Sequence, residues 1–168
     1  MSIGPKLDDA INNSDVMRRT LFSLIFVART KTTKYYAWSI IKNLIAELKS
    51  DYDFLKYIHI DEIEKLEDDI DDIKVISKFD QIPPSQIGQA VQEIVDIFRT
   101  KMGNKAGYFF LTEFKEILGE RYYTVLKKMG VDLRLIDLQK EIYGWDSERH
   151  KIQKQYDSNI AYIRDNKD

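Results

Sequence analysis

Apolar side chains recur at steps of three and four residues through most of this 168-residue chain. Such steps place the apolar residues on one face of a helix, whereas a half-buried strand would show strict alternation. Seven glycines and three prolines leave few breaks between these segments. One of the clearest stripes has intervals of 3, 4 and 3 and consists of Trp38, Ile41, Ile45 and Leu48. The pattern predicts long helices joined by few turns.

Residues 20–40, "TLFSLIFVARTKTTKYYAWSI", hold an apolar cluster, a cationic turn and then aromatic side chains. The cluster Leu21–Ala28 is much shorter than the roughly 20 residues of a membrane-spanning helix. A helix that is apolar nearly all round is surrounded by neighbours. We therefore expect residues 15–50 to form an antiparallel helical hairpin in the core, with Thr32 or Thr33 capping its second helix. The same apolar cluster is also the best candidate for a homodimer seam.

The next segment, "DEIEKLEDDIDD" at residues 61–72, carries eight carboxylates in twelve positions. Its apolar residues nevertheless keep helical steps through Ile63, Leu66, Ile70 and Ile73. Asp61 is suited to cap such a helix, with Glu64 in the reciprocal capping position. The pattern predicts an acidic helix with one buried face. "IKVIS" at residues 73–77 admits a short strand as an alternative.

The second half of the chain contains further helical stripes between clear stop signals. "KVISKFDQIPPS" holds two of the three prolines and marks the strongest break. Helices are expected after Ser85, in "YFFLTEFKEILG", in "ERYYTVLKKMG" and after Asp132. The predicted fold class is all-α, an irregular or orthogonal bundle of about six or seven helices with at most one short strand pair. We expect a polar segment at 1–14, a single helical domain at 15–145 and a peripheral C-terminal helix with a frayed end at 146–168.

The formal net charge of −2 conceals a strong segregation of charge. Residues 1–50 contain eight Lys or Arg and four Asp or Glu, whereas residues 51–72 contain two and ten. Complementary patches steer association and set its register. We expect the acidic face to dock on the basic hairpin of the same chain or of a neighbouring one. The predicted interaction residues are Arg18, Arg19, Lys31, Lys34, Glu67, Asp68, Asp69, Asp71 and Asp72.

Several catalytic chemistries lack the residues that they need. The chain has no cysteine, so it has no disulfide framework and no thiolate nucleophile. His59 and His150 are isolated, and "GNKAG" lacks the spacing of a phosphate-binding loop. A cluster of aromatic residues allows a ligand pocket, but helical spacing favours a place in the core. The cluster consists of Tyr108, Phe109, Phe110, Phe114, Tyr122 and Tyr123.

Two carboxylate patterns resemble those of metal-dependent enzymes. Asp68, Asp69 and Asp72 satisfy a D-D-x-x-D spacing, which locally resembles the motif of prenyl-diphosphate enzymes. Those enzymes need a longer helical chain and a second acidic motif facing the first. Because this chain has neither, the match in so acidic a segment is interpreted as accidental.

The second pattern pairs Glu64 and Glu67 with Glu93 and Asp96. It resembles the E-x-x-E…E-x-x-D arrangement of the all-α nucleoside-triphosphate pyrophosphohydrolases, the MazG-like family. The resemblance implies four carboxylates from two helices that hold magnesium and activate a water against a nucleotide's phosphate chain. It covers only some 35 residues, and "FRTKMGNK" turns polar where the family has a long apolar helix.

The leading functional interpretation is a non-catalytic helical interaction or assembly module, cytoplasmic and without a cofactor. Its partner is expected to be another protein, a second copy of the chain, or both. The first alternative is the magnesium-dependent pyrophosphohydrolase. The second alternative is nucleic-acid binding by the basic hairpin at 16–50, which has Tyr35, Tyr36 and Trp38 nearby. A sequence pI of about 5.8 disfavours that alternative.

Overall fold

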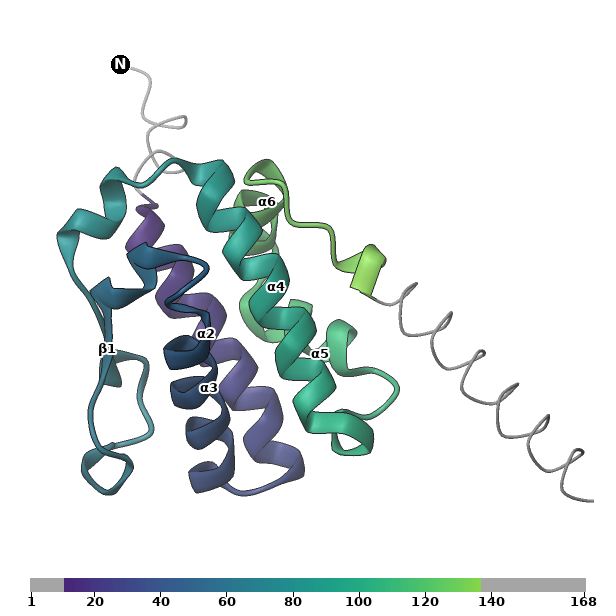
Figure 1. Cartoon of the computed structure of the whole chain (residues 1–168). Helices are drawn as coiled ribbons and strands as arrows, with labels where there is room; N and C mark the ends of the chain where they lie inside the picture. Colours follow the sequence, from purple (N-terminus) through teal and green to yellow (C-terminus); the bar gives the residue numbers. More distant parts are fainter. Residues whose placement is uncertain (1–10, 137–168) are drawn as a thin grey trace, which may run out of the picture. The chain divides into compact units, whose positions relative to one another are not determined.

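The computed structural model describes residues 11–136 of the chain (Figure 1). The chain divides into two compact units, Met1–Asp132 and Leu133–Asp168. Of the second unit, the structure describes residues 133–136, which are helical. The predicted C-terminal helix at 146–168 and most of the predicted polar segment at 1–14 lie outside the described residues.

The first unit is built mainly from α-helices, with several short 3-10 helices and one antiparallel strand pair. The α-helices are α2 (Asn13–Lys31), α3 (Lys34–Leu48), α4 (Pro84–Met102), α5 (Phe110–Leu118) and α6 (Glu120–Lys128). The 3-10 helices are η1 (Asp53–Tyr57), η2 (Ile63–Lys65), η3 (Ile70–Asp72), η4 (Ser77–Gln81) and η5 (Gly103–Ala106). The strands are β1 (Ile58–Ile60) and β2 (Ile73–Val75). The predicted all-α class with one short strand pair is confirmed.

Helix α2 is the central element, because it packs against α3, α4, α5 and α6 as well as β2. Within Leu21–Ala28, most side chains are fully buried, and Phe22 and Phe26 are half-buried. Phe22 lies 6.4 Å from the Trp38 ring, so even this outer side of α2 is partly covered by α3. The segment is core, as predicted, and nearly all of its apolar surface is buried inside the chain.

Helices α2 and α3 form the predicted hairpin. The chain reverses at Thr32 and Thr33, and Thr33 caps α3 because its side-chain oxygen accepts a hydrogen bond from the Tyr36 N–H at 3.1 Å. This is the N-cap geometry that threonine favours. The stripe predicted on α3 is buried from Trp38 to Leu48, so the stripe faces the core.

Helix α4 begins with Pro84, at a position where a missing N–H costs no helical hydrogen bond. Its Gly88 lies against the end of α6, and a Cβ at this position would come within 2.1 Å of the Met129 carbonyl oxygen. Four residues further on, the Gln92 side chain donates to the Asp132 carbonyl and accepts from the Asp132 N–H, both at 2.8 Å. These contacts hold the end of α6 and the residues after it against α4.

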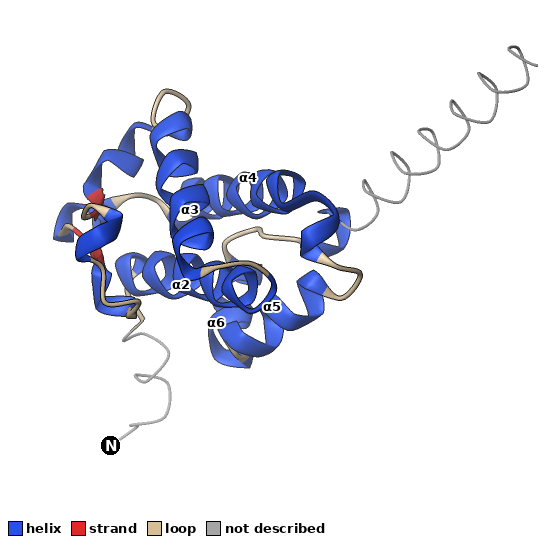
Figure 2. Cartoon of the chain, turned by 90° about the horizontal axis from the view of Figure 1, so that it is seen from below, coloured by secondary structure: helices blue, strands red, loops and turns tan. Residues whose placement is uncertain are grey.

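The predicted acidic helix at 61–73 is wrong. Strand β1 pairs with β2, with His59 opposite Lys74, and residues 61–72 form the connection between them. The two strands lie at one edge of the helices (Figure 2). Aspartate carboxylates in this connection bind nearby backbone N–H groups, which favours turns over a helix. One Asp72 oxygen accepts from the N–H groups of Glu67 and Asp69 at 3.0 and 2.9 Å.

Within residues 11–136, no helix is both long enough and apolar enough to cross a membrane.

Candidate functional site

The connection between the strands, residues 61–72, is named the acidic loop. It is held against the basic hairpin by Asp68, whose backbone has a positive φ of 65°. The Asp68 carboxylate accepts a hydrogen bond from the Trp38 indole N–H at 2.8 Å and forms an ion pair with Arg29. The Lys42 ammonium group donates a hydrogen bond to the Asp61 carbonyl at 3.1 Å. The acidic loop therefore docks on the hairpin of its own chain through a few buried or half-buried contacts.

None of the four predicted cations has a hydrogen bond or ion pair with the acidic loop among the described residues. Arg18 donates to the Ile73 carbonyl at 2.9 Å and lies 3.4 Å from Asp15. Arg19 lies over the Tyr122 ring, 5.5 Å from its centroid. Lys31 pairs with Glu113 of α5 at 3.0 Å and donates to the Ala106 carbonyl at 2.7 Å. Lys34 is exposed at the start of α3, and within residues 11–136 it has no ion pair.

The carboxylates of the acidic loop fall into an anchored group and an exposed group. Asp61 belongs to the anchored group, because its carboxylate contacts His59 at 3.0 Å and Lys74 at 3.4 Å, and these contacts lower its pKa. Asp68 is anchored by Trp38 and Arg29, and Asp72 is anchored by the backbone N–H groups of Glu67 and Asp69. The exposed group consists of Glu62, Glu64, Glu67, Asp69 and Asp71, and among the described residues Glu62 alone of these has an ion pair, with Lys65 at 3.7 Å. The exposed group gives this loop its negative surface.

The four carboxylates of the pyrophosphohydrolase pattern do not form a metal site in the described part of the chain. Glu64 lies in the three-residue 3-10 helix η2 and Glu67 lies beyond its end, so no α-helix presents the E-x-x-E face. Glu93 and Asp96 lie on α4, where Glu93 accepts a hydrogen bond from the Tyr52 hydroxyl at 2.6 Å. No three Asp, Glu or His side chains among residues 11–136 group closely enough to hold a metal ion.

A surface pocket of about 690 Å³ surrounds the Tyr52–Glu93 pair, where the chain after α3 passes α4. Burial is the main cause that raises the pKa of Tyr52 to about 12, and the Glu93 hydrogen bond and charge add to it. The pocket is open and is lined by Asp51, Tyr52, Asp53, Phe54, Gln86, Gln89 and Glu93. Its lining holds three carboxylates, one phenol and two amides, and no cation.

An exposed aromatic pair lies after η5. Tyr108 and Phe109 are 85% and 63% exposed, and their rings meet edge to face at 5.1 Å. The backbone before them is fixed, because Lys31 donates to the Ala106 carbonyl and Lys105 lies 4.5 Å over the Tyr36 ring. Tyr35, also on α3, is 60% exposed. We name Lys105, Tyr108 and Phe109 the cationic–aromatic surface.

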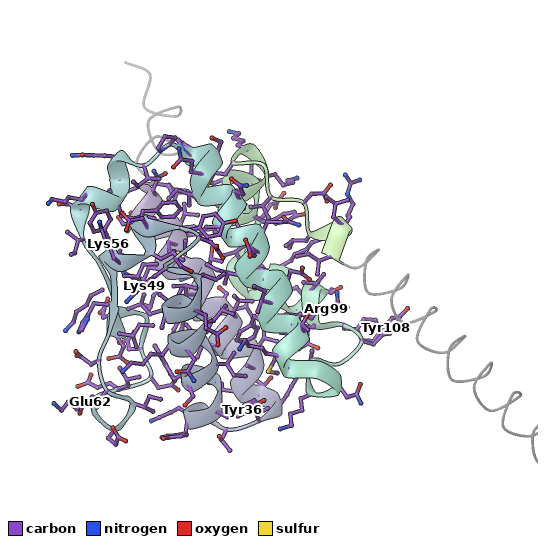
Figure 3. All side chains as sticks on the ribbon, viewed as in Figure 1. Tyr36, Lys49, Lys56, Glu62, Arg99 and Tyr108 are labelled. Carbon is purple, nitrogen blue, oxygen red and sulfur yellow. The ribbon has the colours of Figure 1, made fainter. Side chains whose placement is uncertain are left out.

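The acidic loop and the cationic–aromatic surface flank the first turns of α3. Trp38 contacts Asp68 on one side, and Tyr36 contacts Lys105 on the other. In the view of Figure 3, Glu62 and Tyr108 lie on opposite sides of Tyr36. The two surfaces therefore border the end of the unit at which α3 begins.

The sequence predicts Lys34 and the acidic residues as interaction residues, but it does not predict the exposure of the aromatic pair. The aromatic cluster was interpreted as core, which is confirmed for Phe110 and Phe114 and wrong for Tyr108 and Phe109. The sequence signal that distinguishes the exposed pair from the buried phenylalanines is Gly107, which has a φ of 81° and turns the chain just before the exposed pair. Tyr108 and Phe109 precede α5, which begins at Phe110.

Comparisons of this chain with protein-family models, with curated proteins and with solved structures give no match.

Proposed function

We propose that this chain is a non-catalytic helical interaction module of the cytoplasm, and that it binds protein through the end formed by the acidic loop and the cationic–aromatic surface. The observation that carries the proposal is the adjacent exposure of Tyr108 and Phe109 on a loop whose backbone is anchored by Lys31. Aromatic side chains are enriched at protein interfaces and often provide most of the binding energy.

The charges around the aromatic pair support the same proposal. Lys105 is exposed beside the aromatic pair, and the exposed carboxylates of the acidic loop lie on the other side of α3. A polar rim around an apolar centre is the usual arrangement of a protein interface. Most cations of the basic hairpin, by contrast, contact groups of the same chain, and Trp38 is fully buried. These contacts leave the hairpin few groups for nucleic acid.

A site-specific photo-crosslinker tests the proposal. The photoreactive amino acid replaces Tyr108 in one variant and the exposed Lys78 of η4 in a matched control. We expect protein crosslinks from position 108 that decrease when Phe109 is changed to Ser, and few from position 78. No crosslink at position 108, or equal crosslinking at both positions, would contradict the proposal.

A further inference from the structure

We propose that the surface pocket beside the Tyr52–Glu93 pair binds an organic amine, whose ammonium groups are held by carboxylates and by an aromatic wall. The pocket has a volume of about 690 Å³ and forms where the chain leaves α3 and passes the first half of α4. Small-molecule sites in proteins usually have volumes of about 300 to 1,000 Å³. The pocket lies beyond the end of α3, whereas the proposed interface borders the start of that helix, so the two proposals are independent.

The charge of the lining favours a cation. Asp51, Asp53 and Glu93 supply three carboxylates, and the lining holds no Lys, Arg or His. Asp53 forms an ion pair with Lys56 at 2.8 Å, but their side chains are 85% and 51% exposed, so the pair contributes little. After burial, the hydrogen bond and charge of Glu93 and the charge of Asp51 raise the pKa of Tyr52 further, as a negative potential does.

Aromatic rings form a fixed wall of the pocket. The Tyr52 and Phe54 rings lie 5.9 Å apart with a tilt of 56°. Phe54 in turn meets the fully buried Phe79 ring edge to face at 5.8 Å, so the wall is supported from the core. An aromatic face attracts an ammonium group. The side-chain oxygens of the exposed Gln86 and Gln89 can accept further hydrogen bonds from such a ligand.

The spacing of the carboxylates favours an extended organic cation over a single metal ion. Calcium and magnesium need several oxygen ligands within about 2.0 to 2.6 Å of one point. No three Asp, Glu or His side chains among residues 11–136 group closely enough to hold a metal ion. An amine with several ammonium groups can instead place each group beside a different carboxylate. A free polyamine and the lysine side chains of a peptide both present this chemistry.

Nuclear magnetic resonance of the isotope-labelled full chain, titrated with spermidine at constant ionic strength, tests the proposal. The pocket variant carries Asp51→Asn and Glu93→Gln, and the new amide oxygen at position 93 can still accept from Tyr52. The matched control carries Asp71→Asn and Glu116→Gln, which remove two exposed charges elsewhere. Circular dichroism and a melting curve establish that both variants are folded.

We expect saturable shifts at the Tyr52 and Gln89 amides, with an affinity that is lower by at least about tenfold in the pocket variant and unchanged in the control. Magnesium should bind the pocket more weakly than spermidine. Trilysine distinguishes the two sources of the amine: tighter binding than spermidine identifies a peptide's lysine side chains, and weaker binding identifies a free polyamine.

Four results would overturn the pocket's assignment: no saturable shift, shifts confined to the acidic loop, equal affinities of the pocket and control variants, or magnesium that binds as tightly as spermidine. Each would leave crosslinking from position 108 unaffected. Loss of that crosslinking, conversely, would remove the interface proposal without touching the amine site.

Discussion

At the scale of single residues, Asp68 connects the acidic loop to the helical core. Its carboxylate satisfies the indole N–H of the fully buried Trp38 and pairs with Arg29, while its backbone adopts a left-handed conformation. Aspartate is among the few residues other than glycine that adopt this conformation with little strain. A substitution at position 68 would therefore affect both the contacts of the side chain and the conformation of the backbone.

Changing Asp68 to Ala should destabilise the fold by about 2 kcal/mol, because it leaves the Trp38 donor and the Arg29 cation without their partner. Asp68→Asn should cost less, since its amide oxygen can still accept from Trp38. Denaturant unfolding of these variants measures the change. Asp71→Ala, an exposed change in the same loop, is the control and should lie near the unmodified chain. Equal stability of the Asp68→Ala and Asp71→Ala variants would contradict this role.

Gly88 allows α4 to approach the end of α6. In an exposed helix, Gly→Ala stabilises by about 1 kcal/mol. Here the added Cβ would lie 2.1 Å from a backbone oxygen of Met129, which cannot rotate away as a side chain can. We expect Gly88→Ala to lower stability by about 2 kcal/mol. Thermal melting should show the loss, while the neighbouring exposed Gln89→Ala should be nearly neutral; a stabilised Gly88→Ala variant would disprove the close packing.

Tyr52 gives the fold a dependence on alkaline pH. Burial and Glu93 raise the pKa of Tyr52 from 10.0 to about 12, so the folded state keeps its proton where the unfolded state loses it. The contribution of Tyr52 is fully present below pH 10, and stability falls as pH rises from 10 to about 12. Replacing Tyr52 by Phe should make this fall shallower in unfolding experiments across the same pH range.

The matched control for this titration is Tyr35→Phe, because the Tyr35 hydroxyl makes no hydrogen bond within residues 11–136. It should retain the pH dependence of the unmodified chain. Identical curves for Tyr52→Phe and the unmodified chain would show that Tyr52 is not the titrating group.

At the scale of elements, the start of α2 depends on a residue far away in the sequence. Asn12 provides no side-chain cap for α2, and the Ser14 N–H instead donates to the Asp80 carboxylate of η4 at 2.8 Å. A negative charge at a helix N-terminus is favourable, because the first N–H groups have no partner within the helix. The 3-10 helix η4 therefore serves as the cap of α2.

Asp80→Ala should lower stability by about 1 kcal/mol, which is typical of a lost helix cap. Hydrogen exchange should also become faster at the Ser14 amide, with little change in the middle of α2. Lys78→Ala in the same 3-10 helix is the control. Unchanged exchange at Ser14 in the Asp80→Ala variant would show that this carboxylate does not cap the helix.

The helices with clean apolar stripes were predictable from sequence, and the acidic segment was not. Trp38, Ile41 and Ile45 define α3 because both local spacing and core packing favour the same helix. In residues 61–73 the helical spacing of the isoleucines competed with carboxylate–backbone bonds and with the pairing of β1 and β2. Tertiary pairing outweighed the local pattern there.

The charges of the candidate site were predictable from the sequence, whereas the positions and partners of its side chains were not. Sequence composition identified the acidic segment and Lys34, but it gave no sign that Arg18 and Lys31 bind backbone carbonyls of distant residues. Such contacts depend on how helices far apart in sequence are packed. The exposed positions of Tyr108 and Phe109 likewise depend on where α5 begins.

At the scale of the whole molecule, the separation of charge is the property that connects fold to function. The net charge is only −2, so repulsion between whole molecules is weak, while the local fields at one end are of opposite sign. Exposed charges act over about 8 Å at physiological ionic strength, and more salt shortens that range. Association through this end should therefore weaken with salt, whereas an apolar seam would resist it.

The most direct test of the interaction function is photo-crosslinking from position 108, compared with position 78, at low and high salt. The account predicts protein crosslinks from position 108 that decrease as salt is raised, and few crosslinks from the exposed position 78. No crosslink from position 108, or equal crosslinking from both positions, would contradict it.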